Sequence, residues 1–371
     1  MVRSIQQLEA LREDWDTLAR RFRTPVLDHD WFLSCAEAFY VNRDLGIVTV
    51  RERGALAGVA PLVLESTAAG PKLMQIGASK LYEPGGWLFA SPHALGELVG
   101  AAVAVGRPLL LQRVPADSGV CQAFASVSRR LALTASKNGR PSLGVPTRQS
   151  WDRYAASLPT HLSDNLRRWR RKVERQIGPV EYTCESPAAS QVNGLLERFA
   201  AVEASGWKGR QGSALQARHD LRDFFSRYAT RAAAGGRLRI ATLTFGSTVA
   251  AMEIAIEAYE RLWQLKIGYQ DALSTYYPGL QLTLGSIRYA FERGLESYEF
   301  LGSAAPWQER WKPEPRVYRL LTSYPLTLPG IRAMGHDAMA ALGRRLVMPS
   351  SNGRPGSTAA AKPSVSMEAA C

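Results

Sequence analysis

Cysteine is scarce in this sequence, and its cysteines stand far apart. Only four occur among 371 residues, at Cys35, Cys121, Cys184 and Cys371, and no two of them form a CxxC pair. Disulfide scaffolds and zinc sites need several cysteines at short, regular spacing. The histidines show no HxH or HxxxH spacing either. The sequence therefore predicts neither a disulfide framework nor a metal site, and redox chemistry is not expected.

Long apolar runs are also missing. No stretch reaches the roughly 18 consecutive apolar residues that a membrane-spanning helix needs. The first residues, with Arg3, Glu9, Arg12 and Glu13, form an amphipathic and charged pattern that differs from a signal peptide. We therefore expect a cytoplasmic protein. With 46% hydrophobic residues, the chain can bury one large core or two ordinary ones, since domains usually run to roughly 100 to 200 residues.

Acidic residues are too few to balance the basic ones, and the formal net charge is +13. Such a surplus attracts nucleic acid, anionic lipid headgroups or phosphorylated small molecules. The densest basic patch lies in a predicted helix, residues 163–175, whose apolar residues recur at helical spacing on one stripe. Its basic residues are Arg167, Arg168, Arg170, Arg171, Lys172 and Arg175. This patch is either a solvated helix face or a surface that binds phosphates or a membrane.

Residues 1–150 are predicted to form a first α/β domain. The pattern predicts helices over 5–21, from about residue 30 and over 94–105, and strands over 46–50, 55–64 and 108–112. Arg53-Gly54 provides a turn between the first two strands, and residues 82–86 form an irregular loop. A tail over 349–371, rich in Ser, Ala, Gly and Pro, is predicted to be disordered.

Residues 151–348 are predicted to form a second domain. After the basic helix, helices are expected over 190–204 and 217–234, followed by three antiparallel strands over 238–244, 249–258 and 262–269. The last of these strands leads through Pro278-Gly279 into a helix over 280–293 and a strand over 298–301. Turns are expected at Gly246-Ser247 and at Glu260-Arg261.

Four short motifs occur one after another along the second domain. They are the segments 203–208 (EASGWK), 267–271 (IGYQD), 276–279 (YYPG) and 300–302 (FLG), the last followed by Trp307 and Trp311. Together with the basic helix, the sequence over about 160–312 resembles the CelD-like, Fem-related branch of the GNAT acyltransferase superfamily. Residues 27–32 and 58–62 resemble more loosely the N-terminal GNAT-like repeat of that branch.

The resemblance implies an α/β (α+β) fold of two GNAT-like domains, each a mixed, mostly antiparallel sheet flanked by helices. It also implies transfer of an acyl group to an amine, usually from a CoA or carrier thioester, whereas Fem relatives transfer an aminoacyl group from tRNA. A pyrophosphate is bound well by backbone N–H groups at a helix N-terminus. Pro278, Gly279 and Leu280 are therefore expected to bind acyl-CoA, with Arg168 and Arg171 as further phosphate ligands. The chain departs from the usual GNAT loop because Gly279 is its one glycine.

Acyl transfer from a thioester needs a base for the amine, a donor to the developing oxyanion and an acid for the leaving thiolate. The sequence has neither a GxSxG motif nor a convincing Cys-His pair, and GNAT folds need no covalent nucleophile. Four candidates for the acid and the base lie at predicted element ends: Glu203, Tyr269, Asp271 and Tyr277. If the strand persists to Asp271, then Tyr269 and Asp271 point to the same face.

Substrate-binding candidates are Trp207, Lys208, Glu253, Gly302, Trp307 and Trp311. Glu253 shares one face of the middle strand with Glu257, and a carboxylate in a central strand needs a partner. It either forms an ion pair with Lys266 or acts as a general base lining the acceptor channel. The tryptophans either wall a substrate pocket or belong to the core. The apolar run Ala304-Ala305-Pro306-Trp307 favours a hydrophobic acceptor or acyl chain.

These features predict an N-acyltransferase that uses an acyl thioester and acylates the amine of a lipid precursor, in the manner of ceramide formation, or of an amino sugar. Alternatives are an aminoacyl-tRNA-dependent transferase, an acetyltransferase of exopolysaccharide or cellulose synthesis, and a non-catalytic binding protein on a degenerate GNAT fold. The expected partners are a small acyl donor and an amine acceptor. The positive charge also predicts peripheral contact with the anionic inner face of the membrane, at about 1 kcal/mol per basic residue near the surface.

Overall fold

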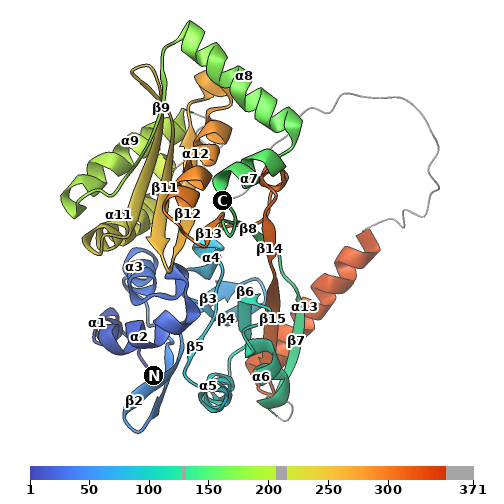
Figure 1. Cartoon of the computed structure of the whole chain (residues 1–371). Helices are drawn as coiled ribbons and strands as arrows, with labels where there is room; N and C mark the ends of the chain where they lie inside the picture. The colour runs from blue at the N-terminus through green and yellow to red at the C-terminus, as the bar shows by residue number, and fades with distance from the viewer. Residues whose placement is uncertain (128–130, 206–214, 348–371) are drawn as a thin grey trace.

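The computed structural model describes residues 1–127, 131–205 and 215–347. The first part of the chain forms helices and short strands (Figure 1). In order they are α1 (Ile5–Glu9), α2 (Arg12–Ala19), α3 (His29–Phe39), β1 (Val48–Glu52), β2 (Ala55–Ala60), β3 (Leu62–Thr67), β4 (Gly70–Gln75), α4 (Ala78–Leu81), β5 (Leu88–Phe89), α5 (Pro92–Ala104), β6 (Leu109–Pro115), α6 (Val120–Val127) and β7 (Ala132–Asn138).

The second part contains longer helices and strands. In order they are β8 (Ser142–Pro146), α7 (Trp151–Ser157), α8 (Thr160–Gln176), β9 (Val180–Glu185), α9 (Val192–Ala204), α11 (His219–Ala234), β10 (Leu238–Phe245), β11 (Thr248–Ala258), β12 (Arg261–Tyr269), α12 (Pro278–Glu292), β13 (Ser297–Glu299), β14 (Glu314–Arg316), β15 (Tyr318–Pro325) and α13 (Leu328–Val347).

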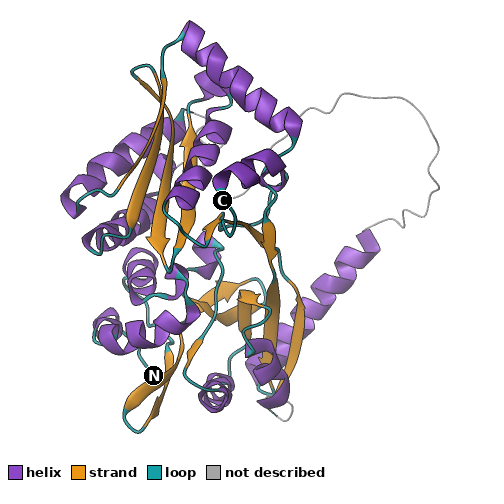
Figure 2. Ribbon diagram, viewed as in Figure 1, coloured by secondary structure: helices purple, strands orange, loops and turns teal. Residues whose placement is uncertain are grey.

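The strands form three sheets, and most neighbouring strands are antiparallel. The first has the order β1-β2-β5, the second β3-β4-β6-β15-β7 and the third β14-β8-β13-β12-β11-β10-β9. Helices flank the sheets (Figure 2), which confirms the predicted mixed α/β class. No single division of the chain separates the strands of the second and third sheets, because β8 belongs to the third sheet and the later β15 belongs to the second. The division at residue 150 stays a prediction.

The seven-stranded sheet has a helical layer on each face. On one face, Ile254 and Ile256 of β11 pack in a core with Phe199 of α9 and Phe224 of α11. On the other face, Ala255 belongs to the same core cluster as Ile287 of α12. Strand alternation explains this arrangement, since successive side chains of β11 point to opposite faces of the sheet. The middle of the sheet is therefore buried on both sides.

Two elements of the first part differ from the sequence expectation. The helix predicted over 5–21 is two helices, α1 and α2, because the chain tightens where Leu11 N–H donates to the carbonyl of Leu8, three residues back. The strand predicted over 55–64 is also two strands, β2 and β3, which belong to different sheets. Pro61 lies between them, and proline has no N–H to give to a strand ladder.

The predicted elements around the third sheet are confirmed, with shifted ends. The basic helix is α8, and the helix over 280–293 is α12, which begins at Pro278. Proline is favoured there because its fixed φ suits the first helical turn. The turn between β11 and β12 is formed by Tyr259 and Glu260, at φ +55° and +59°, one residue earlier than predicted. The strand predicted over 298–301 is the shorter β13, which ends at Glu299.

Candidate functional site

The parallel strands β12 and β13 pair only at the start. Their register runs from Arg261 opposite Ser297 to Trp263 opposite Glu299. Beyond this point β12 continues to Tyr269, whereas β13 ends. The strands therefore part toward their carboxyl ends, where ligands of α/β sheets usually bind. We call residues 264–269 of β12, together with residues 300–302 after β13, the strand opening.

A bulge lies in β12 at the strand opening. Ala255 of β11 is opposite Gln264, but the next residue, Ile254, is opposite Lys266, so Leu265 is an extra residue in β12. A bulge interrupts the ladder and leaves backbone groups available for other partners. A backbone N–H here can donate to an acyl carbonyl oxygen as negative charge develops on it. The bulge thus supplies the candidate oxyanion donor.

A buried polar network lies under α12 beside the strand opening. Glu253 Oε2 accepts hydrogen bonds from Ser286 Oγ at 2.9 Å and from the Tyr298 hydroxyl at 3.1 Å. Gln264 Nε2 donates to the Tyr298 hydroxyl at 2.7 Å. Burial raises the pKa of Glu253 to about 7, although the hydrogen bonds to its carboxylate act the other way. Its second oxygen, Oε1, is buried and has no hydrogen-bond partner. Such a carboxyl group can take up a proton near neutral pH.

The bulge also corrects the predicted Glu253–Lys266 ion pair. Without Leu265 as an extra residue, Lys266 would lie opposite Glu253; with it, Lys266 lies opposite Ile254 and on the other face of the sheet. There Lys266 Nζ lies 2.9 Å from Glu203 Oε1. Glu203 Oε2 accepts the backbone N–H of Leu215 at 2.8 Å. Glu203 is 2% exposed, so its surroundings indicate a buried structural ion pair.

The N-terminus of α12 lies beside the end of β12. A side chain at Gly279 would place its Cβ 3.3 Å from the Tyr269 ring. Glycine thus lets the strand end and the helix N-terminus approach each other. Pro278 has no N–H, and Leu280 N–H donates to Tyr277 O, so this turn offers fewer free donors than a glycine-rich loop. The first turn can nevertheless face an anion through the helix dipole.

Helix α8 packs against this turn. The rings of Trp169 and Tyr277 stack with centroids 3.9 Å apart. Lys172 Nζ lies 5.0 Å from the centre of the Tyr276 ring, and the Tyr276 hydroxyl donates to Gln176 at 3.0 Å. These contacts place the basic helix next to the N-terminus of α12. Strand β12 ends at Tyr269, and Asp271 opens the 3₁₀ helix Asp271–Tyr276. The strand therefore does not persist to Asp271, which was the condition for the two side chains to share a strand face.

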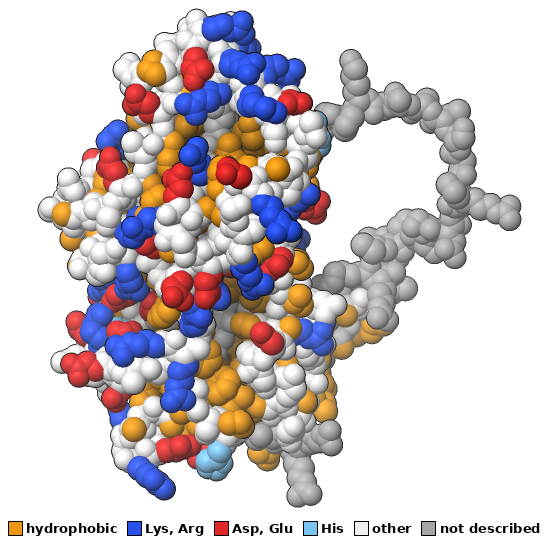
Figure 3. Space-filling model, in the orientation of Figure 1, with side chains coloured by type: hydrophobic (Ala, Val, Ile, Leu, Met, Phe, Trp, Pro, Cys, Tyr) orange, Lys and Arg blue, Asp and Glu red, His pale blue; other side chains and the backbone are white. Residues whose placement is uncertain are grey.

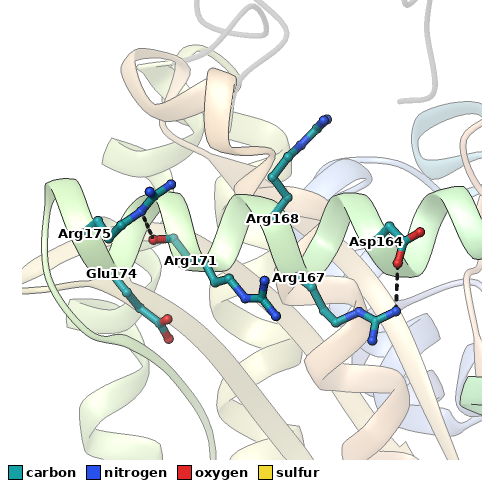
Figure 4. A pocket seen from close by; sticks show the side chains of 6 residues that line it. All are labelled: Asp164, Arg167, Arg168, Arg171, Glu174 and Arg175. Carbon is teal, nitrogen blue, oxygen red and sulfur yellow. Dashed lines mark hydrogen bonds and ion pairs between the residues drawn. The ribbon is translucent and has the colours of Figure 1, made fainter.

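The outer side of α8 is strongly basic. Lys and Arg side chains gather over α8 at the top of the molecule (Figure 3). Arg167 and Arg171 point to the same side of the helix, whereas Arg168 points to another (Figure 4). Within the helix, the Arg167 guanidinium donates a hydrogen bond to Asp164, and the Arg168 guanidinium donates one to Asn165. The exposed guanidinium groups therefore form a surface suited to phosphates near the N-terminus of α12.

A groove separates α8 from the loop after β13. Its volume is about 490 Å³. The lining residues are Pro159, His161, Leu162, Asn165, Trp169, Pro306, Glu309 and Arg310. The apolar members on both walls suit an apolar chain, and polar groups at the rim can orient one end of it.

The loop after β13 is clamped by the first part of the chain. Gly302 N–H donates to Glu83 Oε2 at 2.8 Å, and the Gly302 carbonyl accepts from the Arg113 guanidinium. The Arg113 side chain is fully buried and also donates to Tyr82 O. Burial raises the pKa of Glu83 to about 7, against the charge of Arg113. Gly302 has φ +61°, where glycine is favoured. Two side chains thus fix one wall of the strand opening.

The remaining predicted site residues have different surroundings. Trp311 is 0% exposed and belongs to a hydrophobic core cluster, and Trp307 packs edge to face on Phe300. The core interpretation of Trp311 is therefore confirmed, while Trp307 lies beside the groove residue Pro306. Trp207 and Lys208 lie outside the described residues. No cluster of three or more His, Cys, Asp or Glu suited to a metal ion occurs in the described parts of the chain.

Sequence reasoning missed part of this site. It did not identify Gln264, Ser286 and Tyr298, nor the Glu83–Arg113 clamp. One signal was available: Gln281, Thr283 and Ser286 are polar residues on the buried side of α12. Polar residues at core positions need partners and so indicate a network. Nothing local in the sequence connects Glu83 and Arg113 to Gly302, which is about 190 residues away from Arg113.

Residues 161–310 match the family model of the acetyltransferase (GNAT) domain. No curated protein sequence matches the chain. None of the described helices is long and apolar enough to cross a lipid bilayer.

Several solved structures share the fold. FemX is 12% identical, with a TM-score of 0.58, over 86% of this chain and 96% of its own. The C-terminal (DUF2156) domain of a protein designated a lysylphosphatidylglycerol synthetase, from Agrobacterium fabrum, is 12% identical, with a TM-score of 0.53, over 94% of this chain and 98% of its own. L-PGS from Bacillus licheniformis is 11% identical, with a TM-score of 0.53, over 90% of this chain and 97% of its own. At such identities the likeness concerns the fold alone.

Proposed function

We propose that the chain is an N-acyltransferase that takes its acyl group from acyl-CoA, because residues 161–310 match the GNAT domain model and the fold is similar to that of FemX. The acceptor is an amine that carries an apolar chain, such as a long-chain lipid precursor. The observation that carries the proposal is the strand opening between β12 and β13, with a bulge at one edge and the N-terminus of α12 at its end.

The chemistry is a direct transfer. The amine nitrogen attacks the thioester carbonyl carbon, the C–N bond forms, and the C–S bond breaks. We assign the oxyanion to the backbone at Leu265. The proton that the amine loses passes to the Tyr298 hydroxyl as that group gives its own proton to Glu253 Oε2, 3.1 Å away. The leaving thiolate takes a proton from Tyr269, which lies against Gly279. Tyr277 and Asp271 remain neighbouring candidates for this last role.

The two substrates have different surroundings in this proposal. Arg168 and Arg171 on α8 and the first turn of α12 suit the phosphates of CoA. The groove of about 490 Å³ between α8 and Pro306 suits an acyl or acceptor chain, because its walls include Leu162, Trp169 and Pro306. The polar residues of the groove, His161, Asn165, Glu309 and Arg310, can hold the amine end of a lipid precursor or the hydroxyl groups of an amino sugar. The exposed arginines of α8 can also contact anionic lipid headgroups, which would bring the enzyme to a lipid substrate.

The first test is binding of CoA followed by turnover. A ligand at about 100 times its dissociation constant stabilises the folded state by roughly 2.7 kcal/mol. We expect CoA to raise the Tm of the wild type and not that of Gly279→Val, whose side chain would push Tyr269 away from the helix N-terminus. Gly194→Val is the matched control, because a Cβ at Gly194 meets no atom within 4 Å.

Turnover separates an enzyme from a binding protein. We expect the purified protein to convert long-chain amines to amides with acyl-CoA, measured by mass spectrometry. A shift with CoA but no amide from any amine would support the non-catalytic alternative. No shift in the wild type would contradict the proposed donor.

The second candidate is an aminoacyl-tRNA-dependent transferase. The basic outer side of α8 favours it, because a tRNA offers more phosphates than CoA does. Binding that neutralises phosphates weakens with salt, with a slope of about −0.7 to −0.9 per contact in log units. If tRNA is the donor, Arg167→Gln with Arg171→Gln should reduce that slope by about 1 to 2. Filter binding at several salt concentrations measures it. Equal slopes in variant and wild type would rule against contact through α8.

A further inference from the structure

Exposed apolar side chains gather around α13, which packs on the second sheet, whereas α8 lies beside β9 of the third sheet. Helix α13 projects beside β15 and β7 (Figure 1). The exposed residues are Leu131, Leu133, Leu326, Leu328, Ile331 and Met339. Leu326 N–H donates to Leu131 O, and Leu133 is opposite Tyr324 of β15, which places the strand residues side by side. We call these six residues the α13 surface.

The exposed side of α13 carries several apolar side chains, with the exposed Arg332 and His336 between them. Ala333 and Asp337 face inward: Ala333 is 1% exposed, and Asp337 accepts from the Tyr324 hydroxyl at 2.7 Å and is bonded to Lys72. Leu328 and Met339 are 72% and 70% exposed. With Ile331 and Leu342 they recur at spacings of three and eight residues, so they share one outward stripe. A helix is usually polar on the side that faces water.

Charge around the α13 surface is of one sign. Over residues 131–140 and 317–342 Asp337 is the single acidic residue, and its carboxylate is engaged with Lys72. The basic residues there include Lys137, Arg140 and Arg332, all exposed. A second copy of the chain would bring like charges together. An anionic surface would attract them, while the leucines enter an apolar phase.

We propose that the α13 surface binds the interface of a bilayer that contains anionic phospholipid. Leu328, Ile331 and Met339 enter the boundary between headgroups and acyl chains, and Arg332 contacts the headgroups. The inward contacts of Asp337 with Lys72 and Tyr324 keep the helix attached to the second sheet. The surface is separate from α8, so this contact does not depend on the proposed donor or acceptor.

Vesicle flotation of the full chain tests the proposal. The probes are vesicles of phosphatidylcholine alone and of phosphatidylcholine with phosphatidylglycerol at three to one. We expect the wild type to float with the anionic vesicles and much less with the neutral ones. The double variant Ile331→Ser/Met339→Ser should bind about tenfold more weakly, because it removes two side chains that leave water on binding. Circular dichroism melting checks that the variant folds.

Three controls distinguish the alternatives. Val41→Ser, at another strongly exposed position, should bind like the wild type. If Arg167→Gln/Arg171→Gln removes binding and the α13 variant does not, α8 is the lipid contact and the proposal is overturned. If the wild type floats with neither kind of vesicle, the proposed lipid interface is also overturned. If the wild type dimerises in sedimentation equilibrium and Ile331→Ser/Met339→Ser abolishes the dimer, the α13 surface binds a second copy of the chain instead of a bilayer.

Discussion

Glu253→Gln should lower kcat by about a hundredfold or more, because a positioned proton acceptor contributes roughly 10²- to 10⁴-fold. In the wild type, activity should rise with pH through about 7, the pKa to which burial raises Glu253. Glutamine keeps the shape and the hydrogen bonds from Ser286 and Tyr298 but cannot accept a proton. The variant should therefore lose this limb of the pH profile. Steady-state kinetics with acyl-CoA between pH 5.5 and 8.5 measure both effects.

The same substitution should change how stability depends on pH. The carboxyl pKa is about 7 in the folded chain, above the ordinary 4.5. Between these values the folded state binds more protons than the unfolded state, so the stability contributed by Glu253 falls as pH rises from 4.5 to 7. Glu253→Gln removes this loss. Between pH 4.5 and pH 7, the free energy of unfolding of the Glu253→Gln variant should therefore rise relative to that of the wild type by on the order of 3 kcal/mol.

Glu257 provides the matched control on the same strand face. Burial alone would raise its pKa, but hydrogen bonds from Tyr289 and Arg293 and the charge of Arg239 lower it overall. Its contribution to stability is therefore present above pH 4.5 and is lost as pH falls further. In urea unfolding, the stability difference between Glu257→Gln and the wild type should therefore change with pH in the opposite direction to that of Glu253→Gln. The activity of Glu257→Gln should still rise with pH through about 7, as in the wild type. If Glu253→Gln retains wild-type kcat at every pH, Glu253 is not the proton acceptor.

Arg113→Met should destabilise the protein by roughly 3 to 5 kcal/mol, the usual effect of removing one partner from a buried charged cluster. The change leaves Tyr82 O and Gly302 O without their donor and leaves Glu83 without a counter-charge. Since Arg113 lowers the pKa of Glu83, its loss raises that pKa further. The destabilisation should therefore grow as pH rises above 7. Thermal and urea unfolding at pH 6 and pH 8 measure it.

A double variant identifies the source of this effect. Glu83→Gln in the Arg113→Met background removes the unpaired carboxylate and should recover part of the loss at pH 8. Arg288→Met serves as a control, because its ion pair with Glu292 is exposed and should change stability by no more than about 1 kcal/mol. Additive effects of the two changes at Glu83 and Arg113 would show that they do not act as one clamp.

Local pattern was enough to predict most elements of the third sheet. The helical spacing of Leu162, Leu166 and Val173 predicted α8, and Pro278 followed by an apolar stripe predicted α12. Apolar alternation and turn residues gave β10, β11 and β12. These features depend on residues close in sequence, and each segment carries its own signal. Three strands of the third sheet, β8, β9 and β14, were not predicted from the sequence.

The sequence by itself therefore predicted the GNAT domain that the family model matches over residues 161–310, most helices and strands around the strand opening, and the positive charge of α8. Tertiary structure decided the partners of the titratable groups. Because Leu265 is an extra residue in β12, Lys266 pairs with Glu203 and not with Glu253. The fold also brings Arg113 into contact with Gly302, although about 190 residues separate them in the chain. Register and long-range packing set these contacts, because a shift of one residue reverses the face to which a strand's side chains point.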